Sequence, residues 1–290
     1  MSIVLVIIGL IIGGVLVGQD LISVAKVRSQ ISQIEKYQTA VNTFKLKYGY
    51  LPGDMPGGNS VTGHVDPNSP AGQFGFNYHG VWASGCGGYG AGICGDGNDV
   101  IENNAGSIKQ SGEAHLFWLD LAQAGLISEK ITNSRSPISS FLPTAKLGDD
   151  KYIRVCSGGV SMDPYNSSTG NDSVNYYFLD GLTPYYDTFY GKHSIKVSDA
   201  NSIDTKIDDG LPQSGNVMAV YGSYNSSHMA DIWVGIGTVV TGLEYGGAAT
   251  TVATPYVSTN CYDNNGVVGV QKYQMKNANR PNCGLSIKFK

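Results

Sequence analysis

Residues 2–18 read SIVLVIIGLIIGGVLVG and contain no charged side chain. An uncharged apolar run of this length is typical of a segment that enters a membrane, although a full span needs about 20 residues. No basic region precedes the run and no small-residue cleavage site follows it, so it does not match a removable signal peptide. We therefore expect the run to form the first half of a helix that inserts into a membrane.

The helix is expected to continue after Asp20, because apolar residues then recur at spacings of three and four. The stripe that they form contains Val27, Ile31, Ile34, Tyr37, Val41, Phe44 and Tyr48. The other faces are expected to carry Lys26, Arg28, Gln30, Gln33, Glu35 and Lys36. With Gly49 as a stop, residues 1–48 would form one helix of about 70 Å. The sequence thus divides into a helical segment, residues 1–50, and a globular head, residues 51–290.

Glycines form two pairs at a spacing of four within the apolar run. The pairs are Gly9 with Gly13 and Gly14 with Gly18. Such pairs let apolar helices approach one another closely, so they favour helix–helix packing in a membrane or a bundle. Chance occurrence in a glycine-rich chain is the alternative.

The composition favours a head rich in β-strands and long loops. Of 290 residues, 39 are glycine and 18 are tyrosine, and only 14% are charged. A net charge of -4 without a cluster of Lys and Arg argues against nucleic acid as the main partner. No cofactor is required by anything in the composition.

The pattern of the head predicts an α+β fold with a mostly antiparallel sheet. Residues 53–100 read as a long loop region, because Gly, Asn, Ser and Asp dominate after Pro52. Helices are expected at residues 110–124 and at residues 198–207, with Ser198 as the N-cap. Strands are expected at residues 152–157, 174–179, 217–221, 232–240 and 285–289.

Four of the five cysteines form two local pairs, Cys86 with Cys94 and Cys261 with Cys283. Both pairs lie in loop-like sequence and favour disulfides in an oxidising compartment. A metal site is the alternative, but no C-x-x-C spacing or nearby histidine supports zinc. Cys156 lies alone in a predicted strand and is interpreted as a small buried apolar residue.

The N-terminal run, the amphipathic stretch after it and YGYLPGDMP at residues 48–56 resemble the type IV pilin and type II secretion pseudopilin superfamily. Weaker resemblance continues at residues 94–103, 115–127 and 203–217, which read CGDGNDVIEN, HLFWLDLAQAGLI and IDTKIDDGLPQSGNV. The resemblance covers the N-terminal fifth of the chain well. It implies a long spine helix packed on a β-sheet, with a loop near the C-terminus closed by the Cys261–Cys283 disulfide.

The resemblance also implies how such a subunit is used. It implies that a prepilin is inserted in the inner membrane and is trimmed by a prepilin peptidase. An assembly machinery then stacks copies of the subunit into a helical filament. The filament lies at the cell surface, or in the periplasm for a pseudopilin. The expected assembly helix contains Ile3, Val4, Leu5, Val6, Ile7, Ile8, Gly9, Leu10, Gly13 and Gly14.

Two features depart from the family pattern. Family members carry a glycine cleavage site and a glutamate just before the residue that Met1 matches, so both are expected upstream of Met1. Many pilins also have a proline near the end of the apolar segment, where the helix locally unwinds. Val17 takes that place here, so any unwinding is expected at Gly13 and Gly14 instead.

Two acidic loops are candidate calcium sites, because calcium prefers hard oxygen ligands. The first contains Asp96, Asn98 and Glu102, and its spacing matches only the first half of an EF-hand loop. The second contains Asp204, Asp208 and Asp209, and the resemblance to calcium-binding pseudopilins also favours calcium binding there. Polar turns and a solvated helix face are the alternatives.

No catalytic motif is found. The sequence lacks H-E-x-x-H, G-x-S-x-G and a P-loop, and His115 is expected on a helix surface or half-buried. The sequence therefore predicts a non-enzymatic structural subunit of a filament. The alternatives are a pseudopilin of a type II secretion system and a membrane-anchored adhesin or binding protein that does not polymerise.

Overall fold

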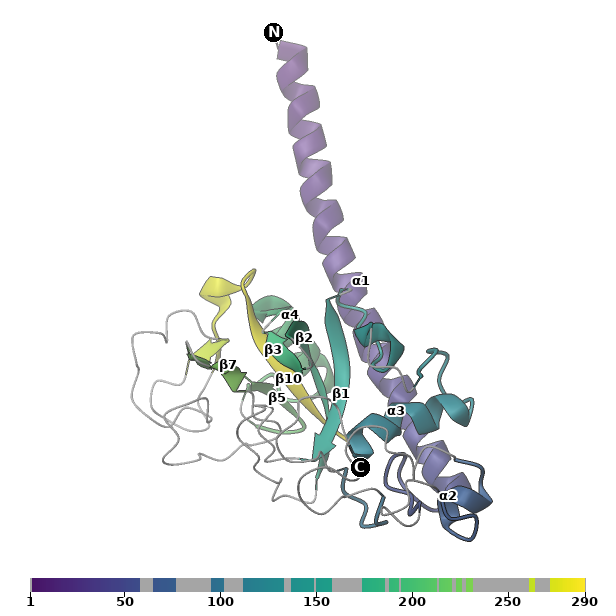
Figure 1. Cartoon of the computed structure of the whole chain (residues 1–290). Helices are drawn as coiled ribbons and strands as arrows, with labels where there is room; N and C mark the ends of the chain where they lie inside the picture. Colours follow the sequence, from purple (N-terminus) through teal and green to yellow (C-terminus); the bar gives the residue numbers. More distant parts are fainter. Residues whose placement is uncertain are drawn as a thin grey trace.

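One helix dominates the molecule and extends far beyond the head (Figure 1). This helix, α1, runs without interruption over Ser2–Tyr48. In the computed structural model, the described residues are 2–57, 65–76, 95–101, 112–132, 137–148, 150–157, 174–185, 188–192, 194–212, 214–220, 223–225, 228–231, 261–263 and 272–289.

The predicted helix is confirmed, and its C-terminal end lies at the expected glycine. Gly49 has φ 82°, and its N–H donates to the carbonyl of Lys45. The α-helix is continuous through Gly13 and Gly14, so the unwinding expected there does not occur in this structure. No proline interrupts the backbone hydrogen bonds before Pro52, which explains the continuity.

The second half of α1 packs on the head through the predicted apolar stripe. Val27, Ile34, Tyr37, Val41 and Phe44 are buried, while Ile31 and Tyr48 pack partly buried against the same core.

The prediction that Gln30 and Gln33 lie on the polar faces is wrong, because both are buried. Their Oε1 atoms accept hydrogen bonds of 2.7 and 3.2 Å from the backbone N–H of Lys146, and Gln33 also donates to the carbonyl of Thr144. The two amides thus bind the backbone of the head loop that contains Thr144 and Lys146.

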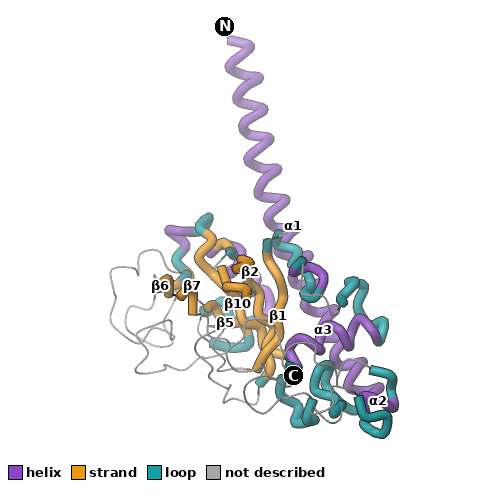
Figure 2. The backbone as a smooth tube through the Cα atoms, in the orientation of Figure 1, coloured by secondary structure: helices purple, strands orange, loops and turns teal. Residues whose placement is uncertain are grey.

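An antiparallel sheet forms the centre of the head (Figure 2). β2 (Asn175–Tyr185) lies between β1 (Lys151–Ser157) and β10 (Pro281–Phe289). Shorter strands extend it: β3 (Thr188–Lys192) pairs with β2, whereas β4 (Ile195–Lys196) and β5 (Val217–Val220) pair with β10. Two separate two-stranded sheets are formed by β6 (Ser223–Asn225) with β7 (His228–Asp231), and by β8 (Tyr262–Asp263) with β9 (Lys272–Tyr273).

Short helices complete the head. They are α2 (Pro70–Gln73), α3 (Glu113–Gln123), α4 (Val197–Ile207) and the 3-10 turns η1 (Ile138–Ser140) and η3 (Met275–Asn277). Ser198 is not an N-cap as predicted, because α4 already begins at Val197, and Lys196 takes the capping position. β4 passes directly into α4 without a loop, which leaves no room for a later cap.

An aromatic cluster joins α1, α3 and the sheet. Tyr37 of α1 meets Trp118 of α3 with ring centroids 4.9 Å apart, and Tyr177 of β2 stacks on Phe289 of β10 at 4.4 Å. Phe117 of α3 contacts Trp118, Tyr177 and Phe289. Each ring buries a large apolar area, so the cluster ties the spine helix firmly to the sheet.

The coarse fold class is confirmed as α+β, with a long N-terminal apolar helix and an antiparallel sheet. The Cys261–Cys283 disulfide is present, with Cα atoms 5.0 Å apart, and Cys156 is buried, as predicted, and takes no part in a disulfide. The predicted Cys86–Cys94 pair and the strand at residues 232–240 lie outside the described residues.

Candidate functional site

The first half of α1 is an apolar surface that no other described segment of the chain covers. The large side chains from Ile3 to Val24 are exposed, with Leu10 at 72%. Among the described residues, α1 is the one helix long and apolar enough to cross a membrane, judged by length and composition, and none of its apolar window is buried. All of the predicted assembly residues from Ile3 to Gly14 lie on this surface.

The glycines of this half contact no side chain among the residues that the structure describes. A Cβ atom placed on Gly9, Gly13, Gly14 or Gly18 would meet nothing within 4 Å. No contact in this part of the chain therefore explains these glycines. The helix packing predicted from their spacing stays a prediction, because it needs a second helix.

Asp20 is the first charged residue of the chain, and it lies among exposed apolar residues. Leu21 and Ile22 follow it with 65% and 59% of their surface exposed. Among the described residues, the first polar contact between α1 and the head comes at Ser23, whose hydroxyl donates to Oδ1 of Asp199 on α4 at 3.1 Å. Asp20 thus marks the boundary between the free and the packed parts of α1.

A groove of about 690 Å³ runs along α1 beside the segment that follows α3. One wall is α1 from Ser29 to Thr43, and the other is formed by residues 125–129 together with Lys146. At its inner edge the Tyr37 hydroxyl donates to Glu129 at 2.7 Å and accepts from the Gln33 amide at 2.8 Å. Burial and the neighbouring Glu129 carboxylate raise the pKa of Tyr37.

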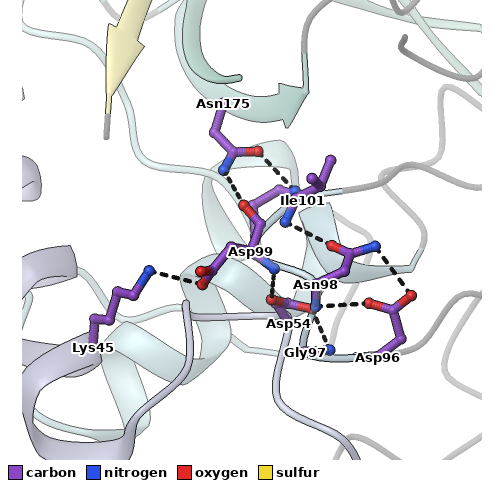
Figure 3. Close-up of polar contacts among 9 residues, drawn as sticks. Lys45, Asp54, Asp96, Gly97, Asn98, Asp99, Ile101 and Asn175 are labelled. Atoms are coloured by element: carbon purple, nitrogen blue, oxygen red, sulfur yellow. Dashed lines mark hydrogen bonds and ion pairs between the residues drawn. The ribbon is translucent and has the colours of Figure 1, made fainter. Parts of the chain in front are cut away.

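The first acidic loop is organised around a residue that the sequence analysis did not select. Asp54 is fully buried, and its carboxylate accepts 2.8 Å hydrogen bonds from the backbone N–H groups of Gly97 and Asp99 (Figure 3). Burial raises the pKa of Asp54 to about 6. Its place in YLPGDMP, between Gly53 and Met55, is a turn signal that could have drawn attention to it.

The predicted ligands in this loop hold the backbone of their own turn. Asp96 accepts from the N–H of Asn98 at 3.0 Å, and Asn98 accepts from the N–H of Val100 at 2.7 Å (Figure 3). Carboxylate oxygens of Asp54, Asp96 and Glu113 lie within 4.8 Å of one another, which adds two acids from distant segments. Glu102 lies outside the described residues.

Flanking contacts fix the same loop to the helix and the sheet. Lys45 of α1 forms an ion pair with Asp99 at 2.8 Å, on an exposed surface. Asn175 at the start of β2 accepts from the N–H of Ile101 and donates to the carbonyl of Asp99 (Figure 3). The loop therefore connects α1 with the edge of the sheet.

The second acidic loop brings its three predicted residues together. Carboxylate oxygens of Asp204, Asp208 and Asp209 lie within 4.8 Å of one another. Asp204 is buried, accepts from the Tyr273 hydroxyl at 2.7 Å, and has its pKa raised to about 6 by burial.

The other two carboxylates of this loop bind local backbone. Asp208 accepts from the N–H groups of Asn216 and Val217, and Asp209 from the N–H of Leu211. Three clustered carboxylates suit a hard cation such as calcium, and they equally suit a retained proton.

The prediction for His115 is wrong, because the side chain is buried rather than half-exposed. It lies on α3 beneath η1, with its ring centroid 6.2 Å from that of Phe141. The helix is buried along most of its length, since it lies inside the aromatic cluster rather than on the surface.

No protein-family model, curated protein or solved structure matches this chain in the three comparisons with known proteins.

Proposed function

We propose that this chain is a structural subunit of a type IV pilin-like extracellular filament, assembled through the apolar half of α1. The observation that carries the proposal is the uncovered apolar surface between Ile3 and Val24 on a helix that stands free of its head (Figure 1). A surface of this extent does not stay in water as a monomer, so lipid or other proteins must cover it.

In the proposal, both lipid and protein cover the apolar half, at different stages. Before assembly the apolar half lies in the inner membrane, and after assembly it lies against α1 of other copies. The open faces of Gly9, Gly13, Gly14 and Gly18 support close packing between copies. A prepilin peptidase and an assembly machinery are the implied partners, as the resemblance of the N-terminal segment suggests.

The attachment of the head supports a building block rather than a tethered, mobile domain. α1 is continuous from the apolar half into the aromatic cluster, and Gln30 and Gln33 bind the loop before β1. Head and helix therefore move as one body. No catalytic role is proposed for the head.

The test is electron microscopy of material sheared from cells that express the chain, with mass spectrometry of its N-terminal peptide. Filaments that contain the chain would support the proposal. The variant Ile11→Lys should abolish them, because it places a charge in the apolar half. Leu46→Lys is the matched control, since Leu46 is also exposed on α1, at 89%, but lies outside that half.

Two alternatives remain in view because the apolar half could serve as an anchor alone. A pseudopilin of a type II secretion system would give short periplasmic assemblies and no surface fibres. A membrane-anchored adhesin would stay monomeric in the membrane fraction. A monomer in that fraction, with no filaments in sheared material, would contradict the filament proposal.

A further inference from the structure

The apolar half of α1 carries one charge that its surroundings leave uncompensated. Among the described residues, Asp20 makes no ion pair, and exposed Leu21, Ile22 and Val24 follow it. Whatever covers these apolar side chains must also approach the carboxylate. Burying an ionised carboxylate without a cation is costly, so the covering surface should supply one.

The groove along the second half of α1 is such a surface. Its α1 wall is formed mostly by small side chains, among them Ser29, Ser32, Thr39 and Thr43. They span about 21 Å of helix at 1.5 Å per residue. Small side chains allow another helix to approach closely, and Leu126 and Ile127 on the opposite wall offer apolar contact.

The charges of the groove complement Asp20. Lys36 and Lys146 line it, and neither makes an ion pair among the residues that the structure describes. The acids that line it are Glu35 and Glu129, and the carboxylate of Glu129 already accepts the Tyr37 hydroxyl. The lysines are thus available cations beside apolar and small side chains.

We propose that this groove receives the Asp20 region of a second copy of the chain, with Asp20 set beside Lys36 and Lys146. The proposal deepens the filament function and rests on it for direction, because two apolar halves in one membrane place both heads on the same side. The helices are then parallel, and Asp20 reaches the level of Lys36 only if one copy is shifted by about 24 Å along the axis.

Such a contact joins two different surfaces of the same molecule. Every copy keeps one free groove and one free Asp20 region, so the contact repeats without closing and builds an open helical assembly. An antiparallel arrangement would instead pair Asp20 and Lys36 twice across a two-fold axis and stop at a dimer.

Cysteine cross-linking of the full-length chain in whole cells that express it separates these arrangements. In a Cys156→Ala background, the double variant Asp20→Cys, Lys36→Cys should give a ladder of dimers, trimers and larger species under mild oxidation. The matched control is Asp20→Cys with Asn42→Cys, because Asn42 is exposed on another face of α1 and does not line the groove. It should give no ladder. Dimers alone would overturn the proposal. So would the absence of a cross-link both here and between Leu16→Cys and Ser32→Cys, a pair that keeps Asp20 and Lys36.

A second measurement tests the charges separately. Leu16 and Ser32 have the same offset as Asp20 and Lys36, so Leu16→Cys with Ser32→Cys reports the same register. Asp20→Lys should lower this cross-link at least several-fold, and adding Lys36→Glu should restore it. Failure of restoration would overturn the role of the ion pair.

The outcomes are distinguishable from those of the filament proposal. Filaments seen by microscopy without either cross-link would leave the filament function standing and overturn this contact. A cross-linked ladder in the same cells without any filament would support this contact and contradict the filament function.

Discussion

The hydroxyl of Tyr37 donates a 2.7 Å hydrogen bond to Oε1 of Glu129, and the hydroxyl oxygen of Tyr37 accepts a hydrogen bond from the Gln33 amide. This pair ties the spine helix to the segment after α3, next to the aromatic contact between Tyr37 and Trp118. The attachment of the head thus combines a polar contact with ring packing at a single residue.

Removing only the hydroxyl of Tyr37 separates the contribution of the polar contact from that of the ring packing. Tyr37→Phe is expected to lower the free energy of unfolding by about 1–3 kcal/mol, because Glu129 and Gln33 lose a partner while the ring stays packed. Denaturant titration in detergent would measure the loss. Tyr48→Phe is the control and should change stability by less than about 0.5 kcal/mol, since the Tyr48 ring is only partly buried. Equal losses in both variants would contradict this account.

The disulfide between Cys261 and Cys283 should contribute measurably to stability. It closes a sequence separation of 22 residues and attaches Cys261, directly before β8, to Cys283 of β10. The double variant Cys261→Ala, Cys283→Ala is expected to lose about 3 kcal/mol, from the chain entropy that the cross-link removes from the unfolded state. Thermal unfolding would detect the loss. An unchanged midpoint would show that the C-terminal segment is held by its other contacts alone.

Two buried carboxylates predict a pH dependence. Burial raises the pKa of both Asp54 and Asp204 from 3.8 to about 6. The folded state then holds more protons than the unfolded state between these values, so these groups make stability fall as pH rises from about 4 to about 6. At pH 7 each shift lowers the free energy of unfolding by about 3 kcal/mol at most.

The variant Asp204→Asn isolates one of these groups. In calcium-free buffer, its stability relative to the parent chain should rise from pH 4 to pH 6 and then stay constant. Urea titrations at several pH values would measure the difference. A difference that is independent of pH would show that the burial of Asp204 does not shift its titration.

Calcium is a separate prediction for the acidic clusters. If calcium binds Asp204, Asp208 and Asp209, saturating calcium should raise the midpoint of thermal unfolding. A calcium concentration one hundredfold above the Kd would add about 2.7 kcal/mol. Asp208→Asn should remove the effect of this cluster, and Asp96→Asn tests the other cluster in the same way. No shift with calcium in the parent chain would show that the carboxylates serve only the backbone of their loops.

The sequence predicted those parts of the fold whose signal is local and periodic. The apolar spacing from Val27 to Tyr48 identified the packed face of α1, and β-branched and aromatic residues located β1, β5 and the core of β10. β2 extends further than predicted because Gly181 and Pro184 usually end a strand, whereas here they pair with β3. The shortest strands, such as β8 and β9, leave no periodic signal.

Contacts between distant segments could not be predicted in this way. Asp54 and Glu113 lie beside Asp96 because the packing of α3 brings these distant segments together. Gln33 is buried where its amide binds the loop at Thr144. The cluster of Asp204, Asp208 and Asp209 was found because all three acids lie in one short stretch. Local acidic spacing was therefore informative, and long-range pairing was not.

The unbroken course of α1 has a consequence for the orientation of the head. Only Leu21 and Ile22 separate Asp20 from Ser23, where the contact with Asp199 begins, so no hinge or linker lies between the apolar half and the head. The head therefore keeps a fixed orientation relative to the apolar half of the helix. A tilt of the apolar half by a few degrees swings the far side of the head by the same angle, so whatever surrounds that half also sets which face of the head points outward.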